Sequence, residues 1–234
     1  MQKRLVILGE GQGDHEALPV LAKRLITEHD GWDAIYLDEN VIRLGHVCSL
    51  MRAGSYDTWI RRLQYALKRP NTGAALVVLD GDAKYFPPGT DQPFCAATVA
   101  AELASSAVVH LNAGDTFSLA VVFACQEYES WLVAGAESLA GRSLEDGRLA
   151  LSANCLPPDG DLEVHHRDAK GWLKRQMAHG YSPTRDQAML TRLVDLDAIR
   201  QRGMRSFRRL DSALIQLCDA VRTNCHLASP KVGS

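Results

Sequence analysis

Short, continuously apolar runs alternate with longer segments of helical periodicity in the first part of the chain. The apolar runs at 3–9, 74–79 and 117–124 lack polar alternation, which is typical of strands buried on both faces. A further strand is expected at 35–37 or at 41–44. Between these strands the apolar spacing predicts helices at 14–29, 55–70, 95–106 and 126–135. This order predicts an α/β fold, with a mainly parallel sheet flanked by helices.

The pattern changes after about residue 139. Gly, Pro and Asp accumulate between 141 and 161, and no further strand is predicted. Helical spacing returns at 168–178, 184–195 and 206–223. We therefore expect an α/β domain at 1–139 and a helical, basic C-terminal extension at 140–234 that packs on it.

Composition places the chain among globular proteins. The 234 residues are 46% apolar and 23% charged, which excludes a disordered or fibrous chain. No window approaches the ~18 apolar residues of a membrane helix, and the apolar run Leu5 to Gly9 is too short for a signal peptide. The six cysteines are scattered without a C-x-x-C pair, so they are expected to be reduced thiols and not zinc ligands. These features predict a cytoplasmic protein with no membrane partner.

The net charge of −2 conceals an asymmetry between the two parts. Residues 1–139 carry 11 Lys and Arg against 17 Asp and Glu, whereas residues 140–234 carry 15 against 11. An acidic N-terminal part and a basic C-terminal part are consistent with a carboxylate site beside a surface that attracts a polyanion. Ordinary variation in surface charge is the alternative.

Acidic residues follow three of the predicted strands. Glu10 follows the first strand, Asp80 and Asp82 follow the strand at 74–79, and Glu127 and Glu129 follow the strand at 117–124. Because ligands of parallel sheets bind at the carboxyl ends of the strands, we expect these carboxylates to converge. Clustered carboxylates repel one another unless a cation is present, and their hard oxygens suit Mg²⁺ or Mn²⁺. Helix capping could explain any single acid, but it does not explain the set.

Nucleotide-binding loops do not account for the glycines at 9, 11 and 13. Their G-x-G-x-G spacing departs from the dinucleotide fingerprint, and Glu10 stands where a pyrophosphate would need backbone amides. The chain also lacks a G-x-x-x-x-G-K-[ST] loop. We therefore do not expect a nucleotide cofactor.

Glu10-Gly11, Asp80-x-Asp82 and the following acidic residue resemble the TOPRIM domain of topoisomerases, primases and overcoming-lysogenization-defect nucleases. Over nearly its full length the chain is also similar to an uncharacterised bacterial TOPRIM-like family. Members of this family commonly occur beside genes for AAA or SMC-like ATPases, and phage defence is suspected. The shared segments are Glu10-Gly11, 17–19, 126–132, 168–173, 181–184, 186–187 and 205–208.

This resemblance implies a role for each acidic residue. Glu10 would be a metal ligand or general base, and Asp80 and Asp82 would be metal ligands. In the nuclease version a second acid four residues after the first also serves the metal, which here is Asp14; Asp14 is also a plausible helix N-cap. This chain has Gly13 where Ser or Thr is frequent, and Asp14 where Glu is usual. Glu127, nearer the strand end than Glu129, would complete the site.

Basic residues in the extension are the candidates for nucleic-acid binding. The segment 199–210 carries five arginines and no acid, and arginine suits phosphate through its paired donors. A solvated helix face is the alternative for this run. The selected residues are Lys170, Arg185, Arg205, Arg208 and Arg209.

The sequence therefore predicts a nuclease that uses Mg²⁺ or Mn²⁺ to hydrolyse phosphodiesters of DNA or RNA, in phage defence with a partner ATPase. Glu10, Asp80 and Asp82 are its expected catalytic residues. Two alternatives stay open. One is a non-catalytic binding or sensor subunit of an ATPase complex, and the other is a primase-like or nucleotidyl-transfer enzyme.

Overall fold

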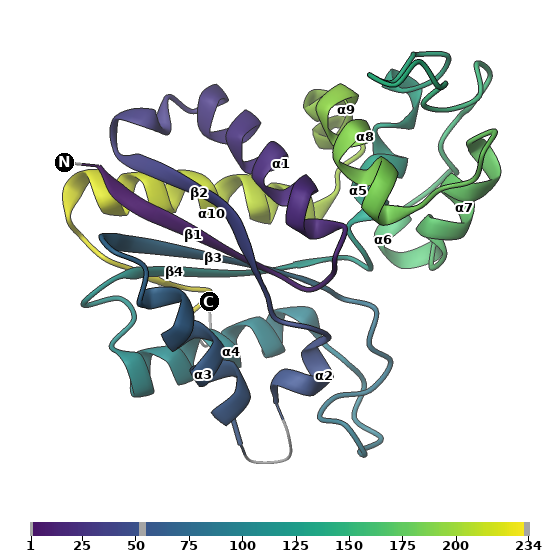
Figure 1. The fold of residues 1–234 in the computed structure, drawn as a ribbon. Helices are drawn as coiled ribbons and strands as arrows, with labels where there is room; N and C mark the ends of the chain where they lie inside the picture. The colour runs from purple at the N-terminus through teal and green to yellow at the C-terminus, as the bar shows by residue number, and fades with distance from the viewer. Residues whose placement is uncertain (1, 52–54, 232–234) are drawn as a thin grey trace.

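A five-stranded parallel sheet forms the centre of the computed structural model, which describes residues 2–51 and 55–231. The strand order is β2-β1-β3-β4-β5, so β1, β3 and β4 are neighbours in its middle. The α/β fold with a parallel sheet flanked by helices is therefore confirmed (Figure 1). The strands are β1 (Lys3–Gly9), β2 (Ile35–Arg43), β3 (Thr72–Asp80), β4 (Ser118–Ala124) and β5 (Ala228–Ser229).

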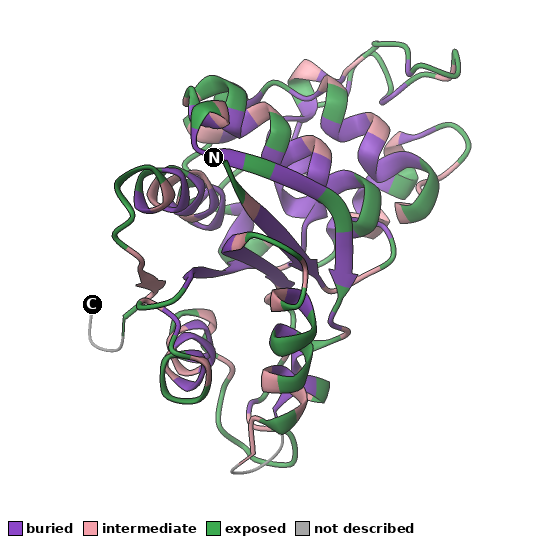
Figure 2. Cartoon of the chain, turned by 60° about the vertical axis from the view of Figure 1, so that its left-hand side comes forward, coloured by how far each residue is buried: buried purple, intermediate pink, exposed green. Residues whose placement is uncertain are grey.

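Helices cover both faces of the sheet because side chains alternate between the faces along each strand. Leu5 and Ile7 of β1 pack on the side of α1 (Asp14–Glu28) and α10 (Arg205–Thr223). Val6 and Leu8 belong to the opposite buried cluster. Figure 2 shows the strands as buried along most of their length. The opposite cluster is covered by α2 (Val47–Leu50), α3 (Asp57–Leu67) and α4 (Ala96–Leu111).

The C-terminal half contributes both to the sheet layer and to a separate group of helices. α10 runs along the face of the sheet beside α1, and one buried cluster combines its side chains with those of β1 and β3 (Figure 1). The shorter helices gather beyond the end of the sheet where β1, β3 and β4 finish. They are α5 (Glu129–Ala134), α6 (Leu162–His165), α7 (Ala169–Gln176), α8 (Ala188–Leu193) and α9 (Leu196–Gln201), with the short helical turns η2 (Ala136–Ser138) and η3 (Pro183–Gln187). A further turn, η1 (Gly31–Asp33), lies at the opposite end of the sheet, before β2.

Three local details differ from the sequence prediction. The second strand is continuous over Ile35–Arg43, so it spans both of the alternatives. A short strand, β5, follows residue 140 and pairs with the start of β4. Asp14 is the first residue of α1 and not its N-cap, because its carboxylate accepts hydrogen bonds from the preceding loop. Within the described residues, no helix combines the length and apolarity needed to cross a membrane.

The N-terminus of α10 is held by a carboxylate from another helix. Glu163 of α6 accepts the backbone N–H groups of Arg205 and Ser206 at 3.1 and 2.7 Å. The same carboxylate accepts Arg205 Nε at 2.8 Å. These bonds satisfy amide groups that a helix start leaves without partners, and they fasten α6 to the sheet layer.

Replacing this carboxylate should destabilise the fold. We expect Glu163→Ala to lower the free energy of unfolding by about 2 kcal/mol, because two helix amides and one guanidinium lose their acceptor. Urea unfolding followed by circular dichroism measures the change. Asp159→Ala, which removes an exposed carboxylate in the preceding loop, is the control. Equal stability of the two variants would contradict the capping role.

Candidate active site

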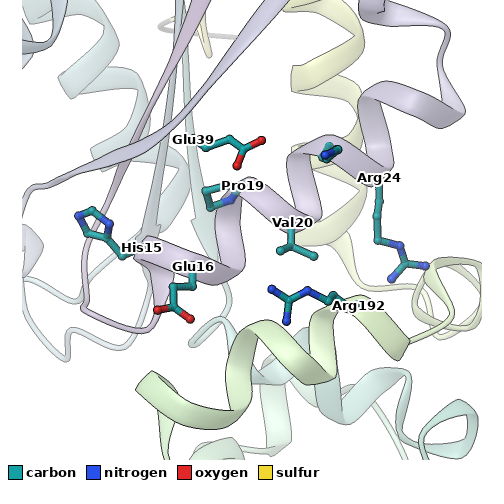
Figure 3. A pocket seen from close by; sticks show the side chains of 8 residues that line it. His15, Glu16, Pro19, Val20, Arg24, Glu39 and Arg192 are labelled. Atoms are coloured by element: carbon teal, nitrogen blue, oxygen red, sulfur yellow. The ribbon is translucent and has the colours of Figure 1, made fainter. Parts of the chain in front are cut away.

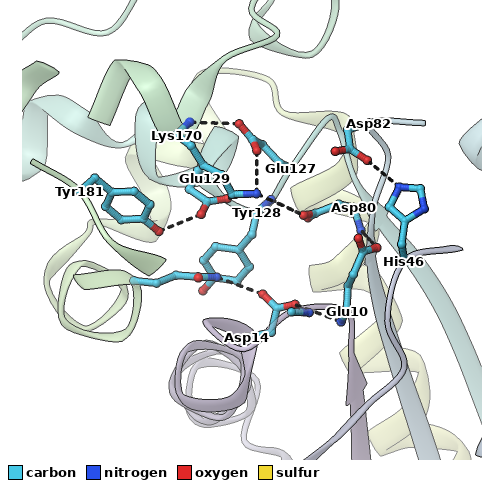
Figure 4. A network of polar contacts seen from close by, with 12 residues as sticks. Glu10, Asp14, His46, Asp80, Asp82, Glu127, Tyr128, Glu129, Lys170 and Tyr181 are labelled. Carbon is cyan, nitrogen blue, oxygen red and sulfur yellow. Dashed lines mark hydrogen bonds and ion pairs between the residues drawn. The ribbon is translucent and has the colours of Figure 1, made fainter. Parts of the chain in front are cut away.

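The carboxyl ends of three neighbouring strands bring acidic residues together. Glu10 directly follows β1, Asp80 ends β3, and the segment after β4 carries Glu127 and Glu129. The backbone N–H of Asp80 donates to Glu10 Oε2 at 3.2 Å, and the N–H of Tyr128 donates to Asp80 Oδ1 at 3.0 Å (Figure 4). The expected convergence at one sheet edge is thus observed for Glu10 and Asp80.

Asp14 shapes the loop that joins β1 to α1. Its Oδ2 accepts the backbone N–H groups of Glu10 and Gly11 at 3.0 and 2.8 Å. Its Oδ1 accepts Gln187 Nε2 at 3.1 Å, which ties the loop to η3 (Figure 4). Both oxygens are therefore engaged by the protein, although Asp14 remains beside the cluster.

Lys170, at the start of α7, lies among the carboxylates. Its ammonium is 2.8 Å from Glu127 Oε2, 3.6 Å from Glu129 Oε2 and 3.7 Å from Asp80 Oδ2. Its backbone N–H also donates to Glu127 Oε1 at 3.0 Å. Burial alone would lower the pKa of Lys170, but the neighbouring carboxylates outweigh it and raise that pKa far above its ordinary value. The side chain is therefore a permanent cation.

One ammonium does not neutralise the whole cluster. Burial, followed by the charge of Asp14, raises the pKa of Asp80 well above its ordinary value. Burial raises the pKa of Glu129 to about 7, although Lys170 opposes the shift. Burial also raises the pKa of Glu10, with partial compensation from nearby His46. The carboxyl groups of the site thus outnumber its cations, and burial favours the protonated form of three of them.

A cavity of about 370 Å³ opens onto part of this cluster. Gly13, in the loop between β1 and α1, lines this cavity. Any side chain at position 13 would place its Cβ too close to the side chain of Gln187. The packing of η3 against the loop therefore favours glycine at position 13, where Ser or Thr is frequent in the nucleases that the chain resembles. The cavity is lined by residues 11–14, Asp80, Glu129, Lys170, residues 182–184 and Gln187.

Glu127 and Glu129 differ in how they meet the cavity. Both oxygens of Glu127 are taken up by Lys170, whereas Glu129 lines the cavity and accepts Tyr181 Oη–H at 2.9 Å. The two carboxylates therefore lie in different surroundings. A role for Glu127 in metal binding stays a prediction. Glu129 is the one of the two that lines the cavity, although its side chain is buried more deeply than that of Glu127.

His46 is a site residue that the sequence prediction missed. Its Nε2 is 3.3 Å from Asp82 Oδ1, and its Nδ1 accepts the N–H of Cys48 at 3.2 Å (Figure 4). Since Nδ1 accepts, Nε2 carries the proton and donates to Asp82. Recognising β2 as one strand ending at Arg43 would have placed His46 at the same sheet edge.

The predicted nucleic-acid-binding arginines are engaged by groups of the protein other than the clustered carboxylates. Arg185 pairs with Asp186 at 2.7 Å, and Arg205 pairs with Glu163 at 2.8 Å. The remaining two, both on α10, donate to Gly203 O (Arg208, at 3.4 Å) and to Ser229 Oγ (Arg209, at 2.6 Å). Of the five selected cations, the structure brings Lys170 alone into the cluster.

A larger groove of about 660 Å³ lies between α1 and α8 (Figure 3). Its walls mix both charges, with Lys23, Arg24 and Arg192 against Glu16 and Glu39. None of the five acidic residues predicted as ligands lines it. The groove is therefore a feature separate from the acidic cluster.

The donor chemistry of the cluster suits a hard divalent cation, because buried carboxylates with raised pKa values are stabilised by added positive charge. Their present arrangement is not a coordination shell. In residues 2–51 and 55–231, no three His, Cys, Asp or Glu side chains are positioned to hold a metal ion together. Lys170 supplies the positive charge between Asp80 and Glu127 instead.

Comparison with known proteins identifies the family. Residues 9–215 match the model of the Domain of unknown function (DUF4276), and the chain belongs to this family. No curated protein and no solved structure matches the chain.

The raised pKa of Glu129 predicts how stability depends on pH. With a folded-state pKa of about 7 against an ordinary 4.5, the folded chain binds the extra proton in this window, so stability falls as pH rises through it. We expect the free energy of unfolding to decrease with rising pH by about 2–3 kcal/mol less in Glu129→Gln than in the wild type. Urea unfolding at several pH values between 5 and 8 measures it. Glu137→Gln, an exposed control, should keep the full dependence; an unchanged slope for Glu129→Gln would contradict the assignment.

Proposed function

We propose that this protein is a divalent-metal-dependent nuclease that hydrolyses phosphodiester bonds of DNA or RNA. The observation that carries the proposal is the hydrogen-bonded convergence of Glu10 and Asp80 from neighbouring strands, with further carboxylates around them. The excess negative charge of this cluster makes a bound cation favourable. The resemblance to TOPRIM nucleases supports the same chemistry.

Glu10, Asp80 and Asp82 would hold Mg²⁺ or Mn²⁺, with Asp14 fixing the Glu10 loop. A bound ion would activate water and stabilise the charge that develops on the phosphate. Glu10, with a raised pKa, is suited to accept the proton of the attacking water. As the water oxygen bonds to phosphorus, the bond to the leaving sugar oxygen breaks and that oxygen is protonated by solvent.

Lys170 is suited to bind the reacting phosphate. It is permanently protonated, and it reaches the cavity that Asp80 and Glu129 also line. A phosphate oxygen can replace one of its three carboxylate contacts, which lie at 2.8–3.7 Å. The ammonium would then stabilise the additional negative charge of the transition state. Lys170 thereby keeps the phosphate-binding role predicted from the sequence.

The proposal includes a cytoplasmic location and action with a partner ATPase in phage defence. The six cysteines are all free thiols, which suits a reducing compartment. The ATPase and the defence role rest on the family resemblance alone.

Removing the converging carboxylates should abolish cleavage. We expect Asp80→Asn and Asp82→Asn each to reduce Mg²⁺- or Mn²⁺-dependent cleavage by about 100-fold or more. The assay uses plasmid, linear and single-stranded DNA and RNA, with and without a co-expressed neighbouring ATPase. Asp115→Asn, in an exposed turn before β4, is the matched control and should cleave normally. Identical traces for wild type and Asp80→Asn would exclude the nuclease.

A non-catalytic binding or sensor subunit is the second candidate. The observation in its favour is that Lys170 already neutralises part of the cluster without a metal. The two functions differ in metal binding, since a cation at about 100 times its dissociation constant should stabilise the folded chain by about 2.7 kcal/mol.

Thermal unfolding with and without Mn²⁺ separates the candidates. For the nuclease we expect Mn²⁺ to raise the melting temperature, and to raise it further in Lys170→Met, because the ion no longer competes with the ammonium. Asp80→Asn should lose the shift. A melting temperature that Mn²⁺ leaves unchanged in wild type and in Lys170→Met would favour the non-catalytic subunit.

A further inference from the structure

A second cavity, of about 320 Å³, lies along the free part of β4. Its floor is strand backbone and side chains from Val121 to Cys125, and Ala96, Ala97 and Ala100 of α4 form one wall. The opposite wall carries Arg205 and Arg209 of α10. The cavity is separate from the acidic site, since the two share no lining residue.

The hydrogen-bond ladder on this edge of β4 stops part-way along the strand. Leu119 N–H donates to Leu227 O at 2.8 Å, and β5 pairs only with Leu119 and Ala120. Alternate residues of a strand direct their backbone groups to the same side, so Phe123 presents its N–H and C=O to this edge. Neither group has a partner among the residues that the structure describes.

Pro230 ends the pairing of β5 at this point. It lines the cavity directly after Ser229, and proline has no N–H to continue a ladder. After Pro230, no strand of the described chain pairs with this edge of β4, and the edge borders the cavity instead. The small side chains of the three alanines on α4 leave room there for an extended backbone.

Arg209 adds an unbalanced positive charge to this edge. Its guanidinium donates to Ser229 Oγ, the end of β5, and lies within ion-pair distance of no carboxylate in the described chain. Burial lowers its pKa, in keeping with a charge that lacks a compensating partner. The other cation, Arg205, is already paired with Glu163 and Asp161. The cavity therefore favours an anionic occupant.

We propose that this cavity binds an extended acidic peptide of a partner protein, which continues the sheet from β5 along β4. The backbone of the peptide would pair with Phe123, and its carboxylate would pair with Arg209. Strand addition of this kind obtains affinity from main-chain bonds and selectivity from side-chain contacts. A volume of about 320 Å³ accommodates a few residues, which matches the short length of free edge.

Selection from phage-displayed random heptapeptides on the full-length protein tests the proposal. We expect the enriched peptides to share an acidic residue and to slow hydrogen exchange at the Phe123 amide. Their affinity should fall about tenfold or more in Arg209→Met, since a charged hydrogen bond is lost. Arg62→Met, which removes an exposed cation on α3, should leave it unchanged.

Three results would overturn the proposal. They are no enrichment over an uncoated surface, enriched peptides that lack an acidic residue, and peptides that leave exchange at Phe123 unaltered. A dimer of this chain that protects the Phe123 amide without peptide would assign the edge to a second copy. Nuclease assays do not enter this test, so its outcome is independent of the proposed function.

Discussion

Burial of clustered carboxylates, together with their mutual repulsion, is the constraint on which this structure depends. Glu10, Asp80 and Glu129 are held close together in a protein environment that disfavours their charged forms. A single ammonium, from Lys170, lies within 4 Å of three carboxylates and offsets part of that repulsion. The carboxyl groups of the cluster still outnumber its cations, and burial favours the protonated form of three of them. A further cation would stabilise the charged forms of these carboxylates, which is the physical basis of the proposed metal-dependent chemistry.

Attachment of the C-terminal helices is what completes this site. The parallel sheet alone provides Glu10 and Asp80 at one edge, because its neighbouring strands end there. Lys170, Tyr181 and Gln187 come from the helical part and contact the carboxylates from the other side. The same part returns to the sheet through α10, which is buried mainly against β4 and β3. The helical extension is therefore both a layer of the core and one wall of the candidate active site.

The arginines of the segment 199–210 are engaged by groups of the protein, although several of them are exposed. A guanidinium beside a carboxylate or a helix carbonyl is satisfied locally, and most of the candidate arginines are in that situation. Arg209 differs because its neighbours are apolar residues, a hydroxyl group and an open strand edge. The acidic cluster and the partly buried Arg209, which has no ion-pair partner among the described residues, thus lie in separate cavities. They can serve different ligands.

The sequence by itself determined the sheet and its acidic edge. Continuous apolar runs define buried parallel strands, and acids that directly follow such strands must share one edge, so Glu10 and Asp80 could be identified from local pattern. Contacts between distant segments were decided only by tertiary structure. Local spacing does not reveal that Lys170 would reach Glu127 across 43 positions, that His46 would face Asp82, or that Glu129 would line the cavity. Those contacts depend on how helices pack and side chains rotate, which is set by the whole core and not by any one segment.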